Sequence, residues 1–143
     1  MRPSCATGIV NMAREDNAVS TRATQEFVKC NIRELPMTST SAHDGVGEIL
    51  FHRIATSASV SGACNFIDFT KMPPGTSIGR HTHREDEEEF YLIVAGTGTM
   101  QLGSETFFVR TGDLIRNPPG GTHALQNTGD EILELFVFEV KVL

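Results

Sequence analysis

The chain has 143 residues, of which 39% are hydrophobic and 21% charged, and its formal net charge is −6. This length leaves room for one domain, and the composition is that of a globular protein. The acidic balance argues against nucleic acid as a partner, because a negative surface repels the phosphate backbone. No apolar run of about 18 residues, the length needed to span a membrane, occurs in the sequence.

The first 30 residues differ in character from the rest of the chain. They are rich in Ala, Thr, Asn and Arg, and the stretch 11–29 has the pattern of a short helix or a loose arm. Charged residues stand at positions 14–16, where a secretory signal would need an apolar stretch. We therefore expect a cytoplasmic protein with an N-terminal arm over 1–30, disordered or packed on a partner subunit, and a folded domain over 31–143.

From residue 31 onward the pattern is one of short strands separated by turns. The β-branched and aromatic stretches are 47–54, 63–69, 76–83, 90–95, 99–102, 105–110 and 131–140. Gly, Pro, Asn and Asp cluster between them at 72–75, 103–104, 111–113, 117–121 and 127–131. Turns about every ten residues, without helical periodicity, predict an all-β sandwich or barrel.

Two histidines two residues apart form the first candidate site. On a strand, His81 and His83 point to the same face, so both imidazoles can offer nitrogen donors to one transition metal. The acidic run 85–89 follows and can supply a carboxylate ligand. His123 lies on a distant segment that barrel closure could bring close.

These residues stand in two spaced patterns. The first is Gly75-x5-His81-x-His83, followed by the acidic run and Gly96, and the second is Gly112-x5-Pro118-x-Gly120-x2-His123-x3-Asn127. The sequence resembles the cupin superfamily over about residues 31–143, because these are its two motifs. The resemblance implies a single jelly-roll barrel, also called a double-stranded β-helix. It further implies that His81, His83, one glutamate and His123 hold a metal ion.

The glutamate depends on where the spacing is counted from. Counting back from Gly96 selects Glu89, whereas counting on from His83 selects Glu87 or Glu88. We prefer Glu89, with Glu88 as the alternative, because an extra residue is absorbed more easily in the loop 84–87 than in the following strand. With Glu89 facing inward, Tyr91 and Ile93 also face inward, and the alternate residues Phe90, Leu92 and Val94 face outward.

Other candidates have weaker signals. Tyr91 is a candidate catalytic residue in the pocket, and Asn127 is expected to brace a turn. His43 and His52 are expected to be surface or hydrogen-bonded residues rather than ligands. Four arginines could meet an anionic substrate but are expected mostly at the surface: Arg53, Arg80, Arg110 and Arg116.

The resemblance implies one divalent transition metal, either Fe, Mn, Zn, Ni or Cu, and a small organic ligand. We expect a metalloenzyme, of the dioxygenase type or a metal-assisted isomerase or lyase. A non-catalytic module that binds or senses a small ligand through the metal is the main alternative, and a purely structural metal is a third. A homodimer is expected, because the outer faces of the barrel carry apolar side chains that need a cover.

Overall fold

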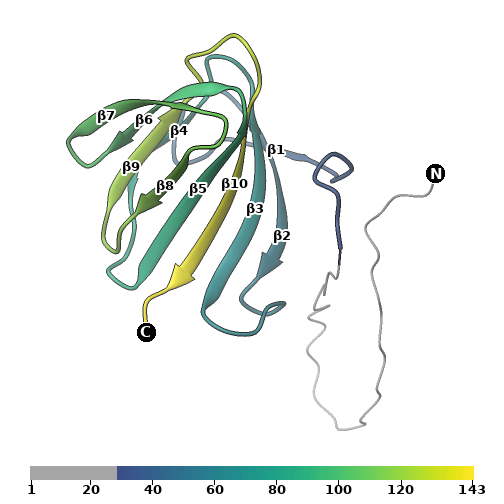
Figure 1. Ribbon diagram of the computed structural model, residues 1–143, viewed down its shortest axis with the longest axis vertical. Coiled ribbons are helices and arrows are strands. Elements are labelled where there is room, and N and C mark those ends of the chain that lie inside the picture. The colour runs from purple at the N-terminus through teal and green to yellow at the C-terminus, as the bar shows by residue number, and fades with distance from the viewer. Residues whose placement is uncertain (1–28) are drawn as a thin grey trace, which may run out of the picture.

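The computed structural model describes residues 29–143 (Figure 1). The predicted arm over 1–30 therefore lies almost entirely outside the described residues. Residues 31–143 form two antiparallel sheets, and the described part contains no helix. This is the all-β fold that the turn spacing predicts. It follows that no helix within residues 29–143 could cross a membrane.

Ten strands make up the two sheets. Their bounds are β1 Thr38–Thr40, β2 Ile49–Thr56, β3 Cys64–Met72, β4 Ser77–Thr82, β5 Glu87–Ala95, β6 Thr97–Leu102, β7 Glu105–Arg110, β8 Leu114–Asn117, β9 Thr122–Gln126 and β10 Leu133–Lys141. One sheet has the order β1-β2-β3-β10-β5-β8, and the other has β4-β9-β6-β7. The last strand, yellow in Figure 1, pairs with both β3 and β5 in the middle of the larger sheet.

Each predicted strand is present, but three strands have no counterpart in the prediction. β1, β8 and β9 are only three to five residues long, too short to show an alternating pattern above the turn signals around them. The strand predicted for 90–95 begins earlier, at Glu87. Part of the acidic run therefore belongs to β5 rather than to the preceding loop.

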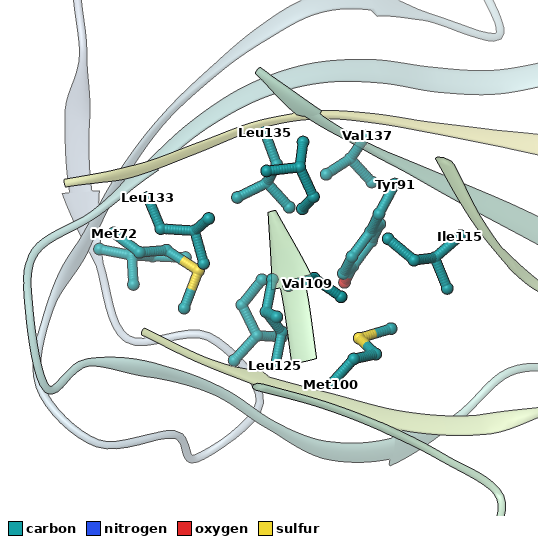
Figure 2. Packing of buried hydrophobic residues seen from close by; sticks show 12 residues of the cluster. Met72, Tyr91, Met100, Val109, Ile115, Leu125, Leu133, Leu135 and Val137 are labelled. Atoms are coloured by element: carbon teal, nitrogen blue, oxygen red, sulfur yellow. The ribbon is translucent and has the colours of Figure 1, made fainter. Parts of the chain in front are cut away.

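The main hydrophobic core fills the space between the sheets (Figure 2). Its members come from both sheets and include Met72, Tyr91, Ile93, Met100, Val109, Ile115, Leu125, Leu133, Leu135 and Val137. Along β5, Glu89, Tyr91 and Ile93 are buried while Leu92 is exposed. The predicted alternation of this strand is confirmed.

A second apolar cluster lies on the outer side of the larger sheet. Leu35, Ile54 and Phe69 are buried there, and Val94 packs against them. Cys30, Ile32 and Met37 also join this cluster. The chain's own segment 30–37 therefore covers part of the face that was expected to be open.

The motif glycines stand at turns that need left-handed backbone angles. Gly75, Gly96, Gly112 and Gly120 all have positive φ, between 70° and 95°. At Gly96 the chain turns from β5 into β6, and an added Cβ would lie 2.5 Å from the Ile132 carbonyl oxygen. Only glycine satisfies both the angle and the contact, so the motif spacing reflects the geometry of the strand ends.

Candidate metal centre

Three histidines meet at one end of the space between the sheets. His81 on β4 is the register partner of His123 on β9, so the two side chains start side by side on neighbouring strands. His83 follows directly after β4 and turns back towards them. The three Nε2 atoms form a triangle in which every side measures 3.1 Å.

Glu89 completes the group from the opposite sheet. Its Oε1 atom lies 3.1 Å from Nε2 of His123 and 3.6 Å from Nε2 of His83. The side chain is buried, and Oε1 has no hydrogen-bond partner. The four ligand atoms all lie within 4.8 Å of one another, so the residues singled out from the motifs form a group that could hold a metal ion.

The protons of two imidazoles can be placed from their partners. Nδ1 of His81 lies 2.8 Å from the Gly79 carbonyl oxygen, and Nδ1 of His83 lies 3.0 Å from Oε2 of Glu139. A carbonyl or a carboxylate only accepts, so each Nδ1 carries the proton and each neutral ring presents a bare Nε2. Two lone pairs and an unpartnered carboxylate oxygen facing one point repel each other unless a cation lies between them. The donor set therefore fits a metal ion.

Burial and hydrogen bonding act differently on the two rings. Burial lowers the pKa of His81 to about 4, so this imidazole is neutral at pH 7. The hydrogen bond to Glu139 raises the pKa of His83 above its ordinary value. Burial disfavours charge on Glu139, but its hydrogen bonds to His83 and Asn65 outweigh burial and lower its pKa. The His81 imidazole is therefore neutral at pH 7, whereas the Glu139 carboxylate stabilises a positive charge on the His83 imidazole.

Comparison with known proteins agrees with the motifs. The family model for the cupin domain matches residues 68–139, which is half of the chain. The chain belongs to the cupin family. An oxalate-binding protein from Thermotoga maritima is 28% identical over 99 residues, which cover 69% of this chain and 81% of the relative.

Solved structures show the same fold. The crystal structure of a predicted oxalate decarboxylase from Thermotoga maritima has a TM-score of 0.75 and 25% identity, covering 78% of this cupin and 97% of that chain. A cupin 2 conserved barrel domain protein from Salinispora arenicola has a TM-score of 0.61 and 18% identity, covering 87% of this cupin and 90% of that chain. The second likeness supports the fold alone.

Glu139 is a site residue of this cupin that the motifs do not include. It stands opposite Glu89 in the β5–β10 register, is buried, and accepts hydrogen bonds from His83 and from Nδ2 of Asn65. The sequence holds a signal for it. Leu135 and Val137 face the core at alternate positions of β10, and Glu139 is the next position on that face.

The other glutamates of the acidic run lie outside the four-residue group. Glu88 points to the other face of β5 and forms an ion pair with Arg116. Glu87 lies beside the far nitrogen of His83, with 3.9 Å between Oε2 and Nδ1. Strand register thus places Glu89, and neither alternative, next to the three Nε2 atoms.

A cavity of about 550 Å³ adjoins the histidines. β1 to β5 and β10 provide its walls, and His81, His83 and Glu89 line one end. His43 also lines it and stacks on His81, with 3.5 Å between ring centroids. His43 lies outside the four-residue group and shields one ring of that group.

Tyr91 lines the cavity and is almost completely buried. Burial raises the pKa of its phenol well above the ordinary value, and the charge of Glu89 and a hydrogen bond to that carboxylate add to the effect. The phenol therefore stays protonated. A catalytic role for Tyr91 stays a prediction.

The remaining candidates have structural partners. Asn127 donates to the carbonyl oxygens of Met72 and Glu131 and accepts from the Gly129 amide, which confirms it as a turn brace. His52 is hydrogen-bonded to the Pro36 carbonyl oxygen. Among the four arginines only Arg53 lines the cavity.

Proposed function

We propose that this cupin binds one divalent transition metal ion through His81, His83, Glu89 and His123, and acts with it on a small organic molecule held in the adjoining cavity. One observation carries the proposal. Bare Nε2 atoms of His81 and His83 and an unpartnered, buried Glu89 oxygen converge at the end of a cavity.

The donor set consists of three imidazole nitrogens and one carboxylate oxygen. Such nitrogen-rich ligation suits Fe, Mn, Ni, Cu or Zn. A six-coordinate ion held by these four residues would have two positions left for a substrate.

The proposed activity is a metal-dependent reaction, either an oxygen-dependent oxidation or an isomerisation or lyase step. When bound, the ion supplies Lewis acidity and, where it is redox active, the electrons for an oxygen-dependent reaction. The protein residues do the rest. Glu139 and Gly79 hold the two imidazoles through their Nδ1 atoms, and the cavity gives the substrate access to the site beside them.

The site is tested by His83→Ala in the full-length protein, with His52→Ala as the matched control. Elemental analysis after purification is expected to find about one metal ion per chain in the wild type and in His52→Ala, and to find much less in His83→Ala. His52 bonds only to a backbone carbonyl among the contacts found, so its loss leaves the site intact. Wild-type metal content in His83→Ala would contradict the proposal.

A second candidate function is a module that binds a small ligand without converting it. The relative from Thermotoga maritima is named for binding oxalate rather than for an activity, and this favours the candidate. The two functions are distinguished by incubating the metal-loaded protein with candidate molecules under air and under nitrogen. Oxygen consumption or product formation supports the enzyme, whereas thermal stabilisation without product supports the binding module.

A further inference from the structure

The lining of the cavity is acidic, whereas a site for a dicarboxylate such as oxalate would be expected to carry cationic side chains. Among the described residues that line it, four carry carboxylates, and the only Lys or Arg is Arg53. The carboxylates are Asp68, Glu87, Glu89 and Glu139. The formal charge of the lining is therefore −3, and a bound divalent ion reduces it to −1.

The one cationic side chain is already engaged. Arg53 donates from Nε and Nη2 to the two carboxylate oxygens of Asp68, and both bonds measure 2.9 Å. Its guanidinium also lies 4.5 Å from the ring centroid of Phe66. Two hydrogen bonds in the fork geometry and a stacked ring hold the group against its own wall. An anionic ligand would have to compete with Asp68 for it.

Two carboxylates near the metal group form no ion pair with a Lys or Arg side chain of the described residues. Glu139 accepts its hydrogen bonds from neutral donors, the Nδ1–H of His83 and the amide of Asn65. Glu87 lies on the same side of His83, accepts a hydrogen bond from the Arg84 backbone amide and is a quarter exposed. Both carboxylates lie next to the His83 ring, which would bind the metal. A ligand bound to the metal would therefore lie near two negative charges.

We infer that this cavity selects a small neutral or cationic molecule, with oxygen donors for the metal, and disfavours dianions such as oxalate. The inference rests on the proposed function, since it takes the metal as the anchor of the ligand. The lining also contains apolar side chains, those of Ile49, Phe51, Ile78 and Val137. A molecule with a hydrocarbon body and an amine or hydroxyl tail directed at Glu87 matches this arrangement.

The test uses three probes that share one metal-binding group and differ in the charge of their tail. They are dopamine, 4-methylcatechol and 3,4-dihydroxybenzoate, titrated under nitrogen into full-length protein loaded with Co²⁺ while the visible spectrum of the ion is recorded. Each dissociation constant is divided by that of the same probe for free Co²⁺. Dopamine is expected to bind at least about tenfold more tightly than 3,4-dihydroxybenzoate, with the neutral probe between them, because charges a few ångströms apart interact strongly in a partly buried site.

Two variants assign the preference to the cavity. Glu87→Gln is expected to reduce the dopamine preference at least about threefold. Glu85→Gln removes the same charge two residues away, from an exposed side chain that does not line the cavity, and is expected to leave the preference unchanged. Equal binding of the three probes, or tightest binding of the anionic one, overturns the inference and leaves the metal site standing. Failure of the protein to take up Co²⁺, or of every probe to alter its spectrum, overturns the proposed function and the inference together.

Discussion

Glu139 lies outside the two motifs, but its hydrogen bond to His83 links it to the candidate metal group. Glu139→Gln keeps the size of the side chain and an oxygen that can accept from Nδ1, but it removes the charge that favours His83 as an electron-rich ligand. Loss of such an outer partner typically costs 10- to 100-fold in metal affinity. We expect a loss of at least about tenfold, measured by competition with a chromophoric chelator.

Glu134→Gln is the matched control for this change. Glu134 lies on the same strand, is 7% exposed compared with 6% for Glu139, and pairs with Arg33 and Lys71 instead of a histidine. Its replacement is expected to lower stability but not metal affinity. An equal loss of affinity in both variants would mean that the effect comes from a general disturbance of β10.

The pKa shifts of the two histidines predict how metal binding depends on pH. His83 has a raised pKa and takes up a proton first as the pH falls. His81 has a pKa of about 4 and is still neutral at that pH. A proton on His83 occupies the same nitrogen that the metal needs. As the pH falls below the raised pKa of His83, affinity should therefore drop by up to about tenfold per pH unit.

Chelator competition between pH 8 and pH 5.5 measures this slope. In Glu139→Gln the carboxylate no longer raises the pKa of His83, so the pH at which affinity begins to fall should move to a lower value. A wild-type affinity that stays constant over this range would show that protonation of His83 does not compete with the metal.

At the scale of elements, Asn127 joins the end of β3 to the loop that leads into β10. Its amide donates to the carbonyl oxygens of Met72 and Glu131, at 2.7 Å and 2.8 Å, and the residue is buried. Asn127→Ala removes both of these hydrogen bonds from buried surroundings. We expect the free energy of unfolding in urea to fall by about 2–4 kcal/mol.

The exposed neighbour Gln126 supplies the control for this prediction. Gln126→Ala is expected to change the stability by less than about 0.5 kcal/mol. Asn127 makes none of its hydrogen bonds with the metal group. The Asn127→Ala variant should therefore still bind the metal at temperatures where the variant remains folded. Loss of metal from the folded variant would show that this brace also positions His123.

The elements also show what the sequence could and could not predict. The long strands were predictable because apolar and polar residues alternate in them over several repeats. The three histidines were predictable because the motif spacing identifies them. β1, β8 and β9 were not, since three to five residues carry too little alternation. Glu89 needed strand register, which depends on pairing with β8 and β10. Arg53 was identified as a possible anion contact, but its pairing with Asp68 depends on the register of β2 and β3.

At the scale of the whole molecule, an apolar patch remains on the outer face of the larger sheet. Leu92 and Leu114 are register partners on β5 and the edge strand β8, and they are 38% and 60% exposed. Beside them the rings of Phe90 and Phe138 stack with 4.9 Å between centroids. The segment 30–37 covers the cluster around Val94, and this patch lies outside that cluster.

We expect a homodimer that buries this patch, because an apolar area beside an unpaired strand edge favours association. Leu114→Lys places a charge at its most exposed apolar residue and should shift the mass measured by light scattering to that of a monomer. Phe108→Lys is the control, since Phe108 is equally exposed, at 63%, but lies on β7 of the other sheet. A monomeric wild type would contradict the expectation. A Leu114→Lys variant that remains dimeric would place the interface elsewhere on the molecule, and the face around Phe108 would then be the next to test.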